Sequence, residues 1–156
     1  MASLVPDLAR YIHCFPTQGA NLGEHLLCAF HWTHQQGYPT TIAICSDAPH
    51  ITHEMVVHAQ EALQGANVVL GPADDGGYYL IAMRKPYDVF SRIPMSNSMV
   101  AARTIGLARA QGLTVRLIEP LFDVDEHADL LRLAKLLKTN GALAPTTAAQ
   151  ICHLAQ

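Results

Sequence analysis

Two patterns of hydrophobic residues alternate along the chain, one typical of helices and one typical of strands. Apolar residues that recur every three or four positions predict helices, and these cover residues 22–36, 52–64, 98–111, 126–138 and 146–155. Short runs that are uncharged or rich in β-branched residues predict strands, over residues 8–14, 40–45, 67–71, 78–83 and 113–119. Each of the first three helices ends at a glycine, and Thr52 is placed to cap the second.

This order of elements predicts the fold class. Strands that alternate with helices of this length indicate an α/β protein with a mostly parallel sheet and helices packed on its faces. The connection between residues 71 and 78 is too short for a crossover helix, so the flanking strands must be antiparallel and the sheet mixed. We expect one domain over residues 1–156.

The stretch "PADDGG", residues 72–77, joins those two strands and allows two interpretations. An Asp-Gly pair between two apolar runs is a strong hairpin signal and needs no ligand. The same turn could instead hold a ligand. The residues alone leave both interpretations open.

Composition narrows the class of protein. Half of the residues are hydrophobic and 15% are charged, which is typical of a folded protein and argues against disorder. No apolar run approaches the roughly 20 residues that cross a bilayer, and no secretory signal is visible. The four cysteines lack CxxC spacing, so we expect free thiols in a reducing compartment. The expectation is a cytoplasmic protein without a membrane partner.

Charge is distributed unevenly along the chain. Between Tyr11 and Met83 there are six acidic residues and no Lys or Arg, so this part carries a formal −6 against −3 for the whole chain. Nucleic-acid backbones are bound by clustered Lys and Arg, so no nucleic-acid partner is expected. A phosphorylated ligand would need a divalent cation to bridge it to such a surface.

Aspartates follow two of the predicted strands. Asp47 comes directly after strand 40–45, and Asp123 and Asp125 follow strand 113–119. Open α/β sheets bind ligands at the carboxyl ends of their strands, where these carboxylates could share one Mg²⁺ or Mn²⁺. The alternatives are a turn-forming role for Asp47 and simple capping of the following helix for Asp125.

The spacing of the histidines and cysteines gives little support for a zinc site or a nucleophilic cysteine. His31 and His34 share a helix face and could ligate zinc, but no Cys or carboxylate lies at ligand spacing beside them, so we expect no zinc site. Cys45 has no specific His–Asp arrangement that would make it a nucleophile, and we interpret it as a buried thiol at a strand end.

Four segments carry a resemblance to a known family. They are "AICSDAPHIT", "VVLGPADDGGYYLIAM", "IPMSNSMVAART" and "LIEPLFDVDEHADLLRL", and "PTQGANLGEHLLCAF" precedes them. In order and spacing they resemble GT-A-fold proteins of unknown function that are glycosyltransferase-like or nucleotide-diphospho-sugar transferase-like. The resemblance covers residues 16 to about 135, and its most specific element is GPAxDGGYY.

The resemblance implies a three-layer, Rossmann-like GT-A sheet that uses a metal-bound nucleotide-sugar or nucleoside triphosphate. It implies Mg²⁺ or Mn²⁺ as the cation, held by Asp47, Asp123 and Asp125. It also implies a substrate-binding set made of Asp74, Asp75, Gly76, Gly77, Tyr78 and Ser96. Thr104 enters on the substrate side through the resemblance only. Catalytic residues are not identified.

The chain departs from the family pattern at several places. His50 replaces an acidic residue, Met95 stands where the family has Trp, and "DEHADL" lacks the Thr cap and Pro of "DTPEDL". Family members also begin with a strand, a basic loop and roughly another βαβ unit, and this chain starts about where that half ends. We therefore expect a GT-A domain that lacks the first βαβ part, with reduced or lost nucleotide binding.

Two functions are compatible with these observations. The first is a metal-dependent glycosyl- or nucleotidyl-transferase. The second is a non-catalytic remnant of the fold that serves as a ligand-binding or assembly module. Loss of the first strands should expose a strand edge and apolar helix surface, so we expect self-association as a two-fold homodimer.

Overall fold

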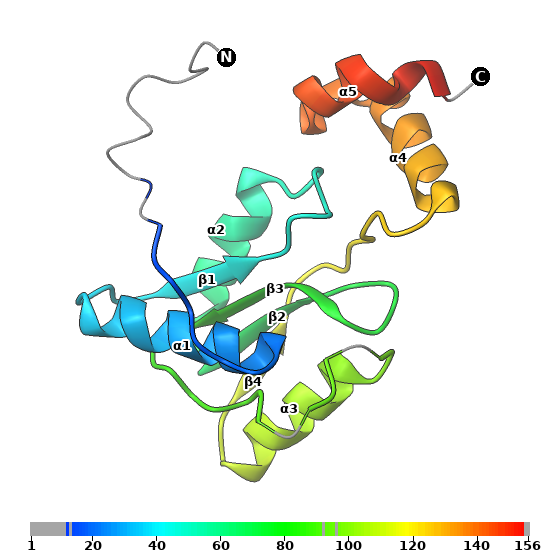
Figure 1. Ribbon diagram of the computed structural model, residues 1–156. Helices are drawn as coiled ribbons and strands as arrows, with labels where there is room; N and C mark the ends of the chain where they lie inside the picture. Colours follow the sequence, from blue (N-terminus) through cyan, green and yellow to red (C-terminus); the bar gives the residue numbers. More distant parts are fainter. Residues whose placement is uncertain (1–11, 13, 92, 96, 155–156) are drawn as a thin grey trace.

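The structure of the protein, a computed structural model, describes residues 12, 14–91, 93–95 and 97–154. Its elements, in chain order, are α1 (Leu22–Gln35), β1 (Thr41–Ile44), α2 (His53–Ala62), β2 (Val68–Pro72), β3 (Tyr78–Met83), α3 (Val100–Ala110), β4 (Val115–Leu117), α4 (His127–Thr139), α5 (Pro145–Ile151) and two short 3₁₀ turns (Figure 1). The sequence-predicted helices and strands over residues 22–138 are confirmed, with small shifts at their ends. The strand predicted over residues 8–14 falls almost entirely outside the described residues.

The four strands form one mixed sheet in the order β1-β3-β2-β4. β3 is antiparallel to both β1 and β2, and β2 is parallel to β4. Strands β1, β2 and β4 therefore share one direction, and β3 runs back between them. The mixed sheet and the antiparallel pairing of β2 with β3 are confirmed. The antiparallel pairing of β1 with β3 was not predicted, so two of the three pairings in the described sheet are antiparallel, although three of its four strands share one direction.

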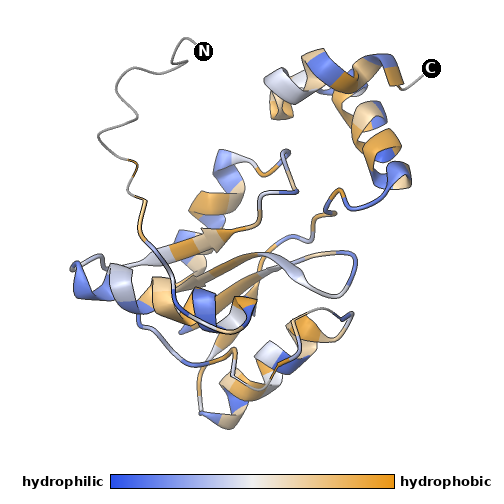
Figure 2. Ribbon diagram, in the orientation of Figure 1, coloured by the Kyte–Doolittle hydropathy of each residue, from blue (hydrophilic) through white to orange (hydrophobic). Residues whose placement is uncertain are grey.

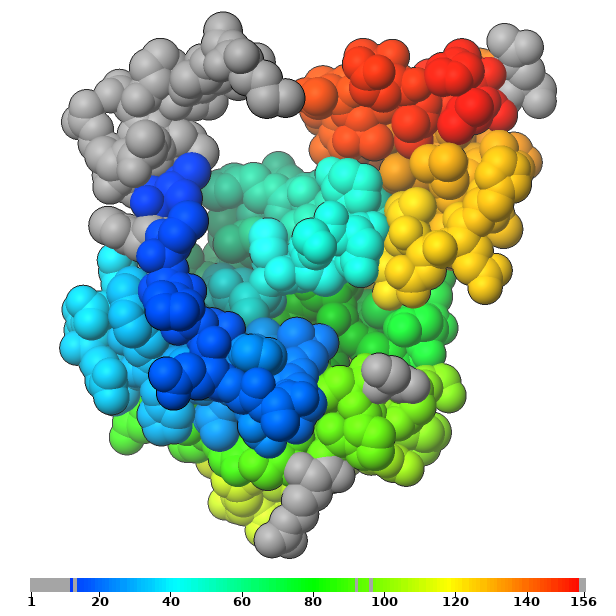
Figure 3. All heavy atoms as spheres, viewed as in Figure 1, coloured from blue at the N-terminus to red at the C-terminus, as the bar shows by residue number. Residues whose placement is uncertain are grey.

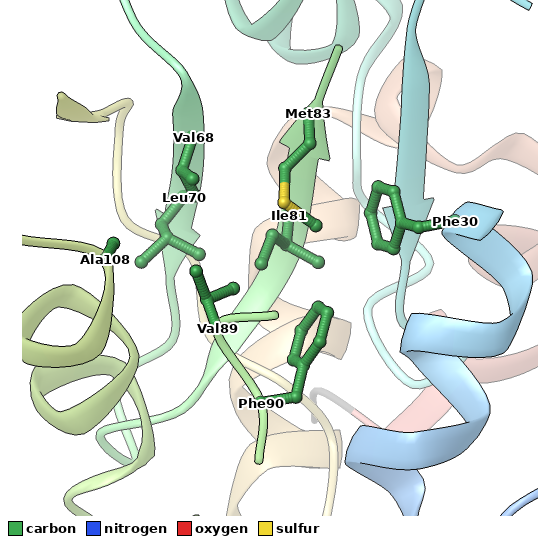
Figure 4. Close-up of a cluster of buried hydrophobic side chains, with 8 residues drawn as sticks. All are labelled: Phe30, Val68, Leu70, Ile81, Met83, Val89, Phe90 and Ala108. Carbon is green, nitrogen blue, oxygen red and sulfur yellow. The ribbon is translucent and has the colours of Figure 1, made fainter. Parts of the chain in front are cut away.

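One face of the sheet packs against α1 and α3. Side chains of β2 and β3 that point to this face, such as Leu70 and Ile81, meet Phe30 of α1 and Ala108 of α3 (Figure 4). Phe30 also stacks on Phe90, with ring centroids 6.0 Å apart. Alternate residues of a strand point to opposite faces, so the intervening side chains must find a second layer.

That second layer is α2. Val69, Leu80 and Ala82 point to the other face and pack against Ala59 and Leu63. Because both faces are covered, β2 and β3 are apolar almost throughout and carry no charge (Figure 2). The result is three layers, helix–sheet–helix, as the α/β pattern predicts.

Local capping explains where two of the helices begin. Asn21 Oδ1 accepts a hydrogen bond from the Glu24 N–H at the start of α1. Thr52 Oγ1 accepts one from the Met55 N–H at 3.3 Å, which confirms the predicted cap of α2.

The C-terminal helices α4 and α5 form a smaller apolar cluster beside the sheet, built on Leu133, Leu137 and Phe122. Glu126 occupies the N-cap position of α4, and its N–H donates to Asp129 Oδ2 at 3.0 Å. The capping alternative considered for Asp125 is therefore wrong, and its carboxylate is available for another role. Among the described residues, no helix is long and apolar enough to span a membrane.

The turn between β2 and β3 depends on Gly76. Its φ is +91°, and a Cβ there would lie 2.0 Å from the carbonyl oxygen of Ser98. The Gly76 carbonyl also accepts a hydrogen bond from the Ala101 N–H at 3.0 Å, which ties the turn to the start of α3. Glycine is thus required both by the backbone conformation and by the close approach.

We predict that Gly76→Ala lowers the free energy of unfolding by about 2 kcal/mol or more, because it adds a left-handed-region penalty to a backbone clash. Urea unfolding measures this. Gly106→Ala is the matched control: Gly106 lies inside α3 with nothing within 4 Å of an added Cβ, so the change should raise stability by about 0.5–1 kcal/mol. Equal effects of the two substitutions on the free energy of unfolding would contradict the requirement for glycine at position 76.

Candidate functional site

Three segments bring acidic residues to one end of the sheet. Because β1, β2 and β4 share a direction, the segments after β1 and β4 and the β2–β3 turn meet there. Leu121 N–H donates to the Pro72 carbonyl and Asp74 N–H to the Leu121 carbonyl, both at 3.0 Å. Val124 N–H donates to the Asp47 carbonyl at 2.9 Å. These bonds hold the three segments side by side (Figure 3).

Asp75, Asp123 and Asp125 form the carboxylate cluster of this end. One carboxylate oxygen of each lies within 4.8 Å of the others. Asp75 is fixed by its own turn, since its Oδ1 accepts the Gly77 N–H at 2.7 Å. Three carboxylate oxygens so close together are a donor set that suits Mg²⁺ or Mn²⁺.

The structure differs here from the sequence-based metal set. Asp123 and Asp125 lie together as expected, but Asp75, which was assigned to the substrate loop, completes the group of three. Asp47 lies beside them and lines the same cavity. The sequence could have predicted that Asp75 belongs to the carboxylate cluster, because Asp75 follows β2 and β2 runs in the same direction as β4, which precedes Asp123 and Asp125.

The carboxylate cluster faces a cavity of about 490 Å³. Of the predicted substrate set, Asp75, Gly77 and Tyr78 line it, together with Met95, Asn97 and Ser98 from the segment before α3. Asp74 points elsewhere and pairs with Arg132. Gly76 shapes the turn through its contact with Ser98. Thr104 is fully buried in α3, and Ser96 lies outside the described residues.

The surroundings of Asp123 are unfavourable for its charged form. The pKa of Asp123 is raised, first by partial burial and then by the charges of Asp75, Asp125 and Asp47. Among the described residues that line the cavity there is no Lys or Arg. On the side of this cavity the carboxylates therefore repel one another with no cationic side chain between them, and a divalent cation would supply the opposite charge.

Cys45 lines the cavity beside Asp47. Burial raises the pKa of the Cys45 thiol to about 12, and the hydrogen bond and charge of Asp47 add to the effect. A thiol in this state is protonated at neutral pH and is a poor nucleophile. Cys45 was interpreted as a buried thiol at a strand end; it directly follows β1, but it is only half-buried.

Tyr78 extends the floor of the same cavity. Burial raises the pKa of its phenol to about 12, so the side chain is neutral at physiological pH. It presents an aromatic surface beside the carboxylates.

His50 packs on Phe122, the residue before Asp123, and was not predicted to have a structural role. Only 2% of its surface is exposed, and its ring lies 4.3 Å from the Phe122 ring. Neither ring nitrogen has a hydrogen-bond partner among the described residues. Burial, and then the charge of Arg132, lowers the pKa of His50.

A family model and a solved structure show what this chain is similar to. Residues 2–97 match the family described as "Uncharacterized protein conserved in bacteria (DUF2064)". A crystal structure of a "putative nucleotide-diphospho-sugar transferase from Desulfovibrio desulfuricans G20" is 34% identical, with a TM-score of 0.79. The alignment covers 85% of this chain and 59% of that one, so the chain spans a little over half of the length of that relative. No protein of curated function matches.

We predict that protonation of His50 destabilises the fold in metal-free buffer. Because burial lowers its pKa in the folded state below the ordinary 6.5, the unfolded state binds the proton first, and stability falls as the pH drops below about 6.5. His50→Leu should lose less unfolding free energy than the wild type between about pH 7.5 and 5.5.

The exposed His31 of α1 provides the control for that measurement. His31→Gln should retain the pH dependence of the wild type in the same chemical unfolding series. Parallel pH profiles for His50→Leu and the wild type would contradict the prediction.

Proposed function

The chain belongs to the DUF2064 family, and from that premise we propose that it is a divalent-cation-dependent transferase acting on a nucleotide-diphospho-sugar. The observation that carries the proposal is the carboxylate cluster of Asp75, Asp123 and Asp125 at the wall of a cavity of about 490 Å³. The 34% identical relative, described as a nucleotide-sugar transferase, supports the class of substrate.

The chemistry of the donor set fits Mg²⁺ or Mn²⁺. Both cations prefer oxygen ligands and keep open positions for water and for substrate phosphate. Asp75, Asp123 and Asp125 would hold the ion, with Asp47 at its side. When bound, the cation would neutralise charge on the leaving diphosphate.

The remaining residues of the cavity would act on the substrate itself. Asn97 and Ser98 place polar groups opposite the carboxylates, and Tyr78 adds a neutral aromatic surface. Asn97 is already oriented, because its Nδ2 donates to the Pro94 carbonyl at 2.8 Å and its Oδ1 accepts the Met99 N–H at 2.9 Å. These groups are suited to hold a sugar or acceptor hydroxyl.

We expect the protein to bind Mn²⁺ by isothermal titration calorimetry. Asp75→Asn, Asp123→Asn and Asp125→Asn should each weaken Mn²⁺ binding by roughly tenfold or more, because losses in the outer shell alone reach roughly 10–100-fold. Asp47→Ala should have a smaller effect on the ion, since Asp47 lies outside the group of three. With Mn²⁺ present, UDP-, GDP- and ADP-sugars should be screened for binding.

The control for this series is Glu61→Gln. Glu61 is an exposed carboxylate of α2 that is absent from the carboxylate cluster and from the cavity lining. The Glu61→Gln protein should bind Mn²⁺ with the same affinity as the wild type. A folded wild-type protein that binds no Mn²⁺, and no sugar nucleotide in its presence, would refute the proposal.

A specific observation favours an assembly role as the second candidate function. β1 pairs only with β3 in the described sheet, so its other edge is unpaired. Ile44 of β1 and Leu22 of α1 are 56% and 57% exposed and line one apolar groove beside this edge. β1 has no charged residue or proline that would block pairing. We propose that a second copy of the chain covers this edge across a two-fold axis.

We predict a dimer in light-scattering measurements of molar mass. Ile44→Lys should shift the protein to a monomer, because it places a charge in the apolar interface. Leu117→Lys is the matched control, since Leu117 is equally exposed, at 56%, but lies on β4 at the opposite edge of the sheet. A monomeric wild type, or a dimer disrupted only by Leu117→Lys, would contradict the assignment.

A further inference from the structure

Arg132 of α4 is held against the back of the carboxylate cluster by two contacts. Its Nη1 lies 2.7 Å from Asp74 Oδ2, and its guanidinium carbon lies 3.9 Å from the centre of the Phe122 ring. Asp74 precedes Asp75 in the chain, and Phe122 precedes Asp123. The two groups that position the guanidinium are therefore the sequence neighbours of two members of the carboxylate cluster.

A second cavity, of about 300 Å³, connects Arg132 with the carboxylate cluster. Asp75, Asp123 and Asp125 line it as well as the larger cavity, and Arg132 lies on its wall. Among the described residues that line either cavity, Arg132 is the only Lys or Arg. Its side chain is 55% exposed, so the guanidinium is accessible to a ligand.

We propose that Arg132 binds the phosphate of the ligand that the metal-loaded carboxylate cluster receives. The ligand class is a diphosphate, bridged between the divalent cation and the guanidinium. This inference rests on the proposed function, because the cation must be bound first.

Charge balance supports this role. A divalent cation leaves three ionised carboxylates with a net charge of about −1, and a diphosphate adds further negative charge. A nearby guanidinium offsets that repulsion, and its planar fork of N–H donors matches two phosphate oxygens. Stacking on Phe122 keeps the fork oriented while its outer donors remain in solvent.

Asp74 would act as the resting partner of Arg132. A half-exposed ion pair contributes only about 0–1 kcal/mol, so a phosphate next to the cation can compete with it for the guanidinium. The adjacent aspartates then have separate tasks: Asp75 faces the ion, and Asp74 holds the arginine until the phosphate arrives.

The experiment titrates inorganic pyrophosphate into the full chain at saturating Mn²⁺ and measures binding by calorimetry. Arg132→Gln should weaken pyrophosphate binding roughly tenfold or more, because hydrogen bonds to charged groups are lost, and Arg132→Lys should lie in between. The affinity for Mn²⁺ alone should be unchanged or higher in Arg132→Gln, since a positive charge is removed. Asp74→Asn should bind pyrophosphate at least as tightly as the wild type.

Lys135→Gln is the charge-matched control, because Lys135 is exposed on the same helix and lines neither cavity. Parallel titrations with UDP and GDP distinguish a nucleotide diphosphate from free pyrophosphate, through tighter binding of one nucleotide. Mn²⁺ binding with no pyrophosphate binding, or with equal affinity in Arg132→Gln and the wild type, overturns this inference alone. Absence of Mn²⁺ binding overturns the proposed function and this inference together.

Discussion

The reversal of the chain between β2 and β3 is the constraint on which the rest of the site depends. Because β3 returns between β1 and β2, the tight turn before β3 lies at the same end of the sheet as the C-terminal ends of β1 and β4. Gly76 makes that reversal possible, and its carbonyl fastens the turn to α3. A wider turn would carry Asp75 away from Asp123 and Asp125.

Packing on both faces of the sheet makes this arrangement rigid enough to hold like charges together. Val69, Leu70 and Ile81 are essentially inaccessible to solvent, and their burial stabilises the hairpin from which Asp75 projects. The fold can therefore tolerate the partial burial and the charge repulsion that together raise the pKa of Asp123. In the proposed metal site, the same repulsion would favour a bound cation, because the cation would supply the missing positive charge.

Most of the fold could be predicted from periodicity, because buried helices and strands each leave a regular pattern. The hairpin and the Thr52 cap depend on neighbouring residues, and the sequence predicted both. Contacts between distant residues were harder to predict. Arg132 and Asp74 are 58 positions apart, and neither segment has a sequence pattern that predicts their ion pair. Asp75 was assigned to the substrate set, together with Asp74, through the family resemblance, and its proximity to Asp123 and Asp125 depends on how three distant segments meet.

The arginine and the buried histidine belong to one continuous set of contacts that ends beside the carboxylate cluster. His50 packs on Phe122, Phe122 supports the guanidinium of Arg132, and Arg132 pairs with Asp74. Burial, and then the charge of Arg132, lowers the pKa of His50 and so disfavours a positive charge on its ring. A neutral His50 leaves Asp74 as the carboxylate that pairs with Arg132 among the described residues, and so keeps the guanidinium next to the residue that precedes Asp75.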